Sequence, residues 1–275
     1  MKKFENIVIA TDLDGTFLAD RSKLVERNIE RVRYFCDNGG HFTFATGRVP
    51  IFTRMAIPAP QEFINLPAVT GNGSCLYDFA EQKPVVEHFI DMDIFMGLAE
   101  LVNELTADAA FRGSALNGFV IPSLEHRANV KEYTRFPDFM EKLIMPMEDW
   151  NKLDLYKVNV LGESEMLERI YPIVCEKFSD RLTITRSGPL AIEVMQHGTS
   201  KAQMLREMVN DRFGKDIMLC TVGDQENDLE MHSVADLPVC PANASDEVKA
   251  VCKHCLCDNN SGVVADLIDL LDRQI

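Results

Sequence analysis

The chain opens with a short apolar run that ends at an aspartate. Residues 6–11 read Asn-Ile-Val-Ile-Ala-Thr, and they are rich in β-branched side chains without the polar alternation of a half-exposed strand. A run of this kind is typical of a parallel strand that is buried on both faces. Because helices must then cover both faces of the sheet, this segment favours an α/β fold.

The residues that follow alternate between helical and strand patterns. A helical pattern of apolar residues after Ser22 closes at Gly39, and residues 41–45 form the next expected strand. The same alternation returns near the C-terminus, where a helix is expected over residues 201–213 and a strand over residues 217–222. Both ends of the chain therefore predict an α/β fold with a doubly wound parallel sheet.

The middle of the chain has a different order of expected strands and helices. Between residues 82 and 190, runs of strand-like segments are interrupted by single helical patterns, which is the arrangement expected of an α+β domain. We therefore expect a discontinuous core over residues 1–81 and 191–275, with an α+β domain inserted over residues 82–190.

Charge and hydropathy exclude several classes of partner. The 28 Lys and Arg residues against 43 Asp and Glu give a formal net charge of −15, without a basic cluster dense enough to follow nucleic acid. No apolar run approaches the roughly 20 residues that cross a bilayer, and the start lacks the apolar region of a signal peptide. We expect a cytoplasmic protein with no nucleic acid or membrane partner; the sequence carries no signal of oligomeric state.

Eight cysteines are present and are expected to be reduced, because they do not form the dense framework of a small secreted domain. Cys252, Cys255 and Cys257, with His254 among them, have the look of a metal-binding cluster. A zinc site would need a second pair of ligands at the usual spacing, which this segment lacks. We interpret it as a helix end followed by a strand, outside the functional site.

Polar loops follow the expected core strands at their carboxyl ends. In chain order they are Asp12-Leu-Asp-Gly-Thr16, Thr46-Gly-Arg48, Gly71-Asn-Gly73 and Gly223-Asp-Gln-Glu-Asn-Asp228. Ligands of open parallel sheets bind at this edge, so the four loops should converge on one site. Clustered carboxylates suit Mg²⁺, which prefers hard oxygen ligands and keeps positions for water and phosphate. Taken alone, an Asp-x-Asp-Gly segment is equally well explained as a polar turn.

Together with Lys201 at the start of an expected helix, these loops resemble, in order and spacing, the four motifs of the haloacid dehalogenase superfamily. The whole chain is similar to the Cof-like branch, whose large cap lies between the second and third motifs, where residues 82–190 lie here. The resemblance implies a magnesium-dependent phosphatase that hydrolyses a small phosphomonoester, such as a sugar phosphate, through an aspartyl-phosphate. Dehalogenases of this fold lack the second aspartate, whereas Asp14 is present here.

The resemblance implies a role for each residue of the site. Asp12 would be the nucleophile, and Asp14 would protonate the leaving oxygen and then activate water. Thr46 would hold the phosphoryl oxygens, and Lys201 would neutralise their charge from a helix N-terminus. The implied metal site comprises Asp12, Asp14 through its backbone carbonyl, Asp224 and Asp228, and the implied phosphate or substrate contacts are Gly47, Arg48, Asn72 and Asn227.

Elementary electrostatics supports these roles. A carboxylate can carry a phosphoryl group covalently, but it repels an anionic phosphoester. A metal ion and Lys201 would supply the positive charge that lets Asp12 approach. Because Asp14 must hold a proton when the alcohol leaves, we expect it to be partly buried close to Asp12.

Several alternatives remain open. A phosphomutase or other phosphotransferase would use the same chemistry, and a non-enzymatic sensor would be phosphorylated at Asp12 to switch a partner surface. Arg48 is equally well explained as a surface ion pair. Asn72 has an alternative as a turn residue, but the place where its loop ends favours a role in the site. Gln225 stands where similar proteins commonly carry glycine, a harmless change if Gln225 faces solvent. Asn243 lies where relatives approach the phosphate, and the sequence leaves its role open.

Overall fold

The computed structural model describes residues 2–126, 129, 131, 133–134, 136–137, 140–186, 188–214 and 216–274. The chain divides into two compact units. The first comprises Met1–Arg48, Thr53–Val86 and Ser200–Ile275, and the second comprises Val49–Phe52 and Glu87–Thr199. That residues 82–190 act as a cap domain over a catalytic core stays a prediction.

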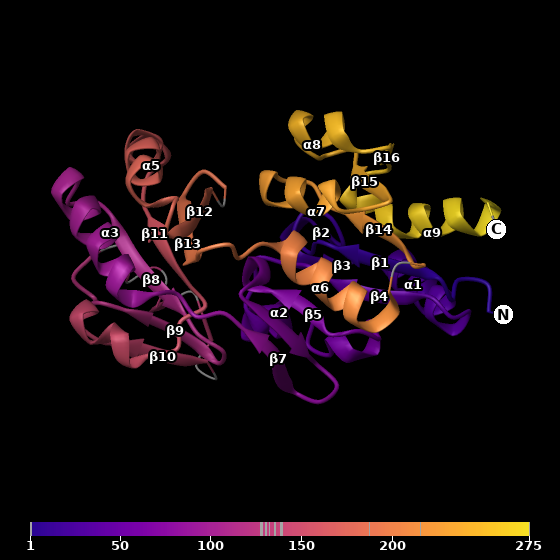
Figure 1. Ribbon diagram of the computed structural model, residues 1–275, viewed down its shortest axis with the longest axis horizontal. Helices are drawn as coiled ribbons and strands as arrows, with labels where there is room; N and C mark the ends of the chain where they lie inside the picture. Colours follow the sequence, from indigo (N-terminus) through magenta and orange to yellow (C-terminus); the bar gives the residue numbers. More distant parts are fainter. Residues whose placement is uncertain are drawn as a thin grey trace. The chain divides into compact units, whose positions relative to one another are not determined.

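A five-stranded parallel sheet forms the centre of the first unit (Figure 1). Its strands are β1 (Ile7–Thr11), β4 (His41–Phe44), β14 (Met218–Val222), β15 (Leu237–Pro241) and β16 (His254–Leu256). Their order across the sheet is β16-β15-β14-β1-β4, and each neighbouring pair is parallel. β1 therefore lies inside the sheet, between β14 and β4, as its continuous apolar sequence predicted.

Helices cover this sheet on both faces. They are α1 (Glu26–Asp37), α6 (Lys201–Phe213), α7 (Leu229–Ser233), α8 (Asp246–Val251) and α9 (Val263–Gln274), whereas α2 (Pro50–Ala56) is divided between the two units. On α6, Met204 packs against Val8 and Ala10 of β1. Ile9 points to the opposite face of the sheet and is also fully buried. The predicted α/β fold with a doubly wound parallel sheet is confirmed.

Short elements complete the first unit. They are β2 (Leu18–Ala19), β3 (Lys23–Leu24), β5 (Ala68–Thr70), β6 (Cys75–Asp78), β7 (Lys83–Glu87), η1 (Asp20–Ser22), η2 (Pro60–Glu62), η3 (Gly71–Gly73), η5 (Glu226–Asp228) and η6 (Asn259–Ser261). A parallel bridge between Ala45 and Val69 places β5 beside the end of β4. The loop after β5 therefore reaches the same edge of the sheet as the loop after β4.

The second unit is α+β, and a six-stranded sheet of order β10-β9-β8-β11-β13-β12 forms its centre. Its elements are α3 (Met92–Leu105), β8 (Ala110–Ser114), β9 (Gly118–Ile121), β10 (Glu141–Ile144), η4 (Met147–Lys152), β11 (Lys157–Leu161), α5 (Ser164–Phe178), β12 (Leu182–Arg186) and β13 (Ala191–Gln196). Phe95 of α3 and Ile170 of α5 share one core cluster with Val158 and Val160 of β11. Among the described residues, neither unit has a helix long and apolar enough to span a bilayer.

Two buried polar residues of β11, Lys157 and Asn159, alternate with the apolar Val158 and Val160. Lys157 Nζ lies 2.6 Å from Glu193 Oε1, and Asn159 Nδ2 donates to the same oxygen at 3.2 Å. Both charged side chains are 5% exposed. Burial alone would raise the pKa of Glu193, but Lys157 outweighs it and the pKa is lowered. This pair is therefore a buried ion pair whose partners depend on each other.

Candidate active site

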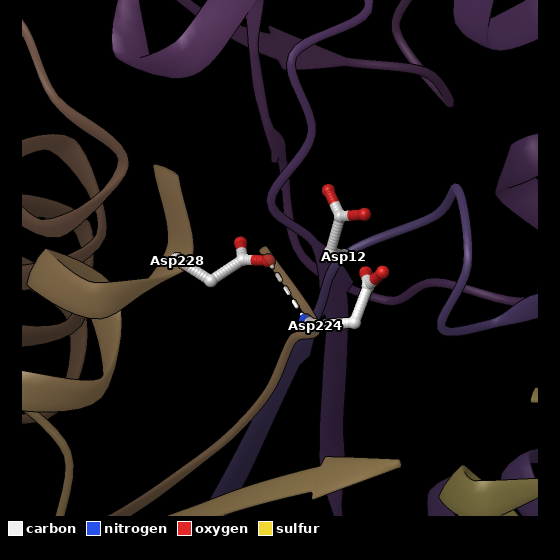
Figure 2. A group of neighbouring side chains, drawn as sticks. All are labelled: Asp12, Asp224 and Asp228. Carbon is white, nitrogen blue, oxygen red and sulfur yellow. Dashed lines mark hydrogen bonds between the residues drawn. The ribbon is translucent and has the colours of Figure 1, made fainter. Parts of the chain in front are cut away.

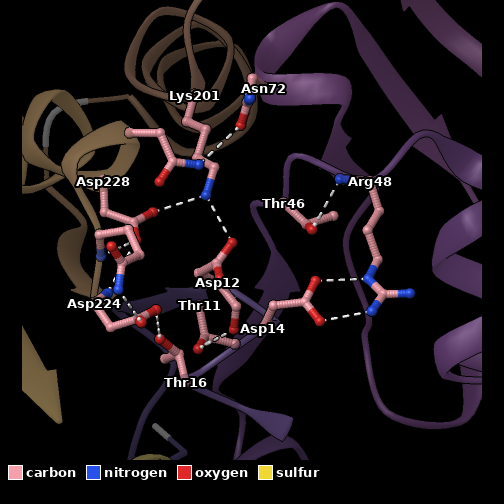
Figure 3. A network of polar contacts seen from close by, with 12 residues as sticks. Thr11, Asp12, Asp14, Thr16, Thr46, Arg48, Asn72, Lys201, Asp224 and Asp228 are labelled. Atoms are coloured by element: carbon pink, nitrogen blue, oxygen red, sulfur yellow. Dashed lines mark hydrogen bonds and ion pairs between the residues drawn. The ribbon is translucent and has the colours of Figure 1, made fainter. Parts of the chain in front are cut away.

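The loops after β1, β4, β5 and β14 bring their polar side chains together at one edge of the sheet (Figure 3). Asp12 directly follows β1, and its backbone N–H donates to the carbonyl of Val222, the last residue of β14, at 2.8 Å. Asp224 lies two residues beyond Val222. The parallel register of β1 and β14 therefore fixes these two aspartates side by side, all within the first unit.

Asp12, Asp224 and Asp228 form a group of buried carboxylates (Figure 2). Each can offer one oxygen, and these oxygens lie within 4.8 Å of one another. Asp228 folds back over its own loop, because its Oδ2 accepts from the backbone N–H of Asp224 at 3.0 Å and of Gln225 at 3.2 Å. Within the described part of the chain, this group has the arrangement that could hold a metal ion.

Lys201 joins two of these carboxylates. Its Nζ lies 2.7 Å from Asp12 Oδ1 and 2.7 Å from Asp228 Oδ1, and the residue is 1% exposed. Lys201 is the first residue of α6, and the side chain of Ser200 caps that helix by accepting from the backbone N–H of Gln203. The cap fixes the start of the helix and so fixes where the ammonium group lies.

The site holds more negative than positive charge. Burial raises the pKa of Asp12 to about 8; the ammonium of Lys201 opposes this rise, and the carboxylates of Asp228 and Asp224 add to it. The pKa of Asp224 is also raised, chiefly by burial. One ammonium group thus pairs with two of three neighbouring acidic side chains. A divalent cation would restore the balance, and three carboxylate groups are the hard oxygen donors that Mg²⁺ prefers. The residues therefore fit magnesium.

Asp224 is held from two sides. Thr16 Oγ1 donates to its Oδ1 at 2.8 Å, and Gln225 Nε2 donates to its Oδ2 at 3.0 Å. Gly15 lies against the same carboxylate in the left-handed region at φ +75°, where a Cβ would fall 2.5 Å from Asp224 Oδ2. Glycine is therefore required both by the backbone conformation and by the close approach.

Two supporting residues make contacts that the sequence left open. Gln225 is exposed, which is the condition under which its replacement of glycine was interpreted as harmless, and its side chain also donates to Asp224 and closes a reciprocal capping box with Asp228. The side-chain amide of Asn243 donates to the carbonyl of Gly15 at 2.8 Å. The sequence signal for the contact between Gln225 and Asp228 is their spacing of three residues, which is that of a capping box.

Asp14 does not have the environment that the sequence predicted. Its side chain is 54% exposed instead of partly buried, and both of its oxygens accept from Arg48, whose Nε and Nη2 each lie 2.6 Å away. The expectation overlooked that a guanidinium binds a carboxylate in bidentate fashion, which favours an outward position. Arg48 is thus in an ion pair, as one interpretation held, but its partner is the proposed acid of the site.

Asn72 lies in close contact with Thr46 and Gly47. Asn72 is buried in the left-handed region at φ 56°, and its backbone N–H donates to the carbonyl of Thr46 at 3.0 Å. Its Oδ1 accepts from Asn227 Nδ2 at 3.2 Å. A Cβ at Gly47 would fall 3.1 Å from that same oxygen, so the absence of a side chain there admits the amide. Oxygen and nitrogen of the amide are assigned from this network.

Comparison with known proteins identifies the family. The family profile described as haloacid dehalogenase-like hydrolase matches residues 9–268, which include all four loops and Lys201. The chain belongs to this family. The haloacid dehalogenase-like assignment agrees with the resemblance seen in the motifs, and it makes this protein a hydrolase. The roles of individual residues in this hydrolase stay predictions.

The alignments with named relatives extend over nearly the whole chain of this hydrolase. YwtE of Bacillus subtilis, named a 5-amino-6-(5-phospho-D-ribitylamino)uracil phosphatase, is 23% identical over 96% of this chain and 97% of its own. YbhA of Escherichia coli, named a pyridoxal phosphate phosphatase, is 24% identical over 95% and 97%. The crystal structure of SMU.1108c from Streptococcus mutans matches with a TM-score of 0.82 at 23% identity, over 97% and 98% of the two chains. At this identity, the structural match shows a shared fold.

Proposed function

We propose that this hydrolase is a magnesium-dependent phosphatase that acts on a small phosphomonoester through an aspartyl-phosphate at Asp12. The observation that supports it best is the buried group of three carboxylates with Lys201 bound between Asp12 and Asp228. Two relatives that are named as phosphatases of small phosphorylated metabolites support the same class of substrate.

In the first step, a carboxylate oxygen of Asp12 attacks phosphorus. A bond forms between that oxygen and phosphorus, the bond from phosphorus to the alcohol oxygen breaks, and the alcohol leaves with a proton. Lys201 holds Asp12 in position through Oδ1 and contributes positive charge. A bound magnesium ion would supply further positive charge, which lowers the pKa of Asp12 and offsets the charge of the phosphate.

Asp14 supplies the proton to the alcohol. In the second step it takes a proton from water as the water oxygen forms a bond to phosphorus, and the bond from phosphorus to Asp12 breaks, which releases phosphate and restores the carboxylate. For these steps its carboxyl group must leave the guanidinium of Arg48 and turn toward Asp12. An anionic phosphoester can replace Asp14 on Arg48, because a guanidinium binds phosphate and carboxylate in the same bidentate geometry. Arrival of the substrate thus releases the acid that the reaction needs.

Hydrolysis of phosphoesters tests the proposed function directly. With Mg²⁺, the protein should release inorganic phosphate from p-nitrophenyl phosphate and from members of a panel of phosphorylated metabolites, and EDTA should abolish the release. In water labelled with ¹⁸O, the label should appear in the phosphate. Absence of hydrolysis by the folded, metal-supplied protein would contradict the proposal, and transfer of the phosphoryl group to a sugar hydroxyl would indicate a phosphotransferase.

Metal binding has its own expected effect on stability. Mg²⁺ at 100 times its dissociation constant should stabilise the protein by about 2.7 kcal/mol, which raises Tm by several degrees. Thermal unfolding with and without Mg²⁺ measures this shift. The shift should disappear in Asp224→Asn and persist in Asp180→Asn, an exposed aspartate of the second unit. An undiminished shift in Asp224→Asn would place the ion elsewhere.

A further inference from the structure

Three thiols meet at the edge of the parallel sheet. Cys240 on β15 and Cys255 on β16 are direct partners in the parallel register, and Cys252 is the residue that ends α8. Cys240 is buried, Cys252 is half-buried, and Cys255 is exposed on the edge strand. The segment predicted as a helix end followed by a strand is confirmed, but the sequence did not indicate that Cys240 joins it.

Cys240 is the common neighbour of the other two thiols. Cys255 is its partner in the strand register, with a thiol that donates to the carbonyl of the next residue, Pro241, at 3.8 Å, and Cys252 packs against the small apolar cluster that contains Cys240. Paired residues of neighbouring strands lie about 4.8 Å apart, inside the range of about 4.4–6.8 Å between Cα atoms that a disulfide spans. The backbone therefore already places Cys240 and Cys255 at a distance that allows a covalent link.

The third thiol of the original segment is placed differently. The backbone N–H of Cys257 donates to Asp266 Oδ2 at 3.4 Å. Burial is the main cause that raises the pKa of Cys257 to about 12. Cys257 thus belongs to a different neighbourhood and offers a matched control for the group of Cys240, Cys252 and Cys255.

We propose that Cys240 and Cys255 form an oxidation site, at which a peroxide converts the two thiols into a disulfide. The sulfur of Cys255 attacks one peroxide oxygen, so an S–O bond forms, the O–O bond breaks, and Cys255 becomes a sulfenic acid. The sulfur of Cys240 then attacks the sulfur of Cys255, the S–S bond forms, and water leaves with the proton of Cys240. Two thiols lose two electrons, and hydrogen peroxide is reduced to two molecules of water.

The order of these steps follows from exposure. Burial is the main cause that raises the pKa of Cys240, and it also raises the pKa of Cys252 to about 11. Thiols that keep their protons react slowly with peroxide, since the thiolate is the nucleophile. Cys255 is exposed to solvent and therefore meets the oxidant first, whereas Cys240 is protected from it but lies against the sulfenic acid once that has formed.

The oxidation site adjoins the turn that supports the acidic loops. One residue separates Cys240 from Ala242, and the turn continues to Ser245, whose backbone N–H donates to the carbonyl of Asp224 at 3.0 Å. In the same turn, Asn243 holds the carbonyl of Gly15. A disulfide between β15 and β16 would therefore form next to residues 242–245, which hydrogen-bond to the loops that contain Gly15 and Asp224.

Mass spectrometry tests the proposal without reference to turnover. The protein is treated with hydrogen peroxide, remaining thiols are alkylated, and the chain is digested without reduction. We expect a linked peptide pair joining Cys240 to Cys255, lighter than the two free peptides by two hydrogen atoms and reversed by dithiothreitol. The link should be lost in Cys255→Ser, an exposed position where the substitution leaves the core intact, and kept in Cys257→Ser.

Two results would overturn the proposal. The first is oxidation of Cys255 by peroxide to a sulfinic or sulfonic acid while the thiol of Cys240 stays reduced. The second is a link that joins other cysteines or that forms in Cys255→Ser at the rate of the unchanged protein. Because the readout is a mass, it does not depend on the phosphatase proposal, and failure of either leaves the other standing.

Discussion

Asp12→Asn should lower kcat for phosphoester hydrolysis by about 10⁴-fold or more, because an amide cannot carry the phosphoryl group as an acyl phosphate. The substitution keeps the size of the side chain at a site that is 7% exposed, so the fold should be preserved. Initial rates of phosphate release under saturating substrate measure the effect. A variant that keeps a tenth of the normal turnover would show that Asp12 is not the phosphoryl carrier.

The pH dependence of the unfolding free energy tests separately whether Asp12→Asn removes the titration of Asp12. The folded pKa of Asp12, about 8, lies above the ordinary value near 3.8, so the protonated form is the one that folding favours. This contribution to stability is complete below the ordinary pKa and is lost as the pH rises through about 8. Without metal, urea unfolding should show that loss in the unchanged protein and a smaller one in Asp12→Asn.

Lys201→Met should affect both folding and chemistry. Removing the ammonium leaves Asp12 and Asp228 buried without their shared cation, which should cost about 3–5 kcal/mol of unfolding free energy. It should also lower kcat by about 10²–10³-fold, since a charge directed at the phosphoryl oxygens is lost. Urea unfolding and initial rates at a temperature where the variant is folded measure the two effects separately.

Lys157→Met is the matched control for Lys201→Met. Like Lys201, Lys157 is a buried lysine in an ion pair. Its loss leaves Glu193 buried without the ammonium that lowers the pKa of Glu193. The cost in stability should be similar, about 3–5 kcal/mol, whereas kcat should stay within about tenfold of normal. Equal losses of kcat in the two variants would mean that Lys201 acts through stability alone.

The positions of Asp12 and Asp224 could be predicted because they follow from a general rule of the fold. Asp12 comes directly after an apolar run and Asp224 comes two residues after another, and the carboxyl ends of parallel strands share one edge of the sheet. The run that precedes Asp12 is short and rich in β-branched residues, which is typical of a buried strand and favoured the α/β class before any motif was considered. Lys201 was predictable for a similar reason, since a capped helix start determines where its first residues lie.

The contacts of Asp14 and Cys240 could not be predicted in the same way. The outward position of Asp14 results from a long arginine side chain 34 residues away in sequence, and no local pattern encodes that choice of rotamer. The pairing of Cys240 with Cys255 depends on the register of β15 and β16. Register between parallel strands is set by packing across the whole sheet, which a single sequence does not display.

The configuration at phosphorus tests the covalent role of Asp12 most directly. A chiral, isotopically labelled phosphorothioate ester is hydrolysed by the enzyme, and the configuration of the released thiophosphate is determined. Attack by Asp12 followed by attack of water gives two in-line displacements, so the account predicts net retention of configuration. Net inversion would show a single displacement by water and would contradict an aspartyl-phosphate at Asp12.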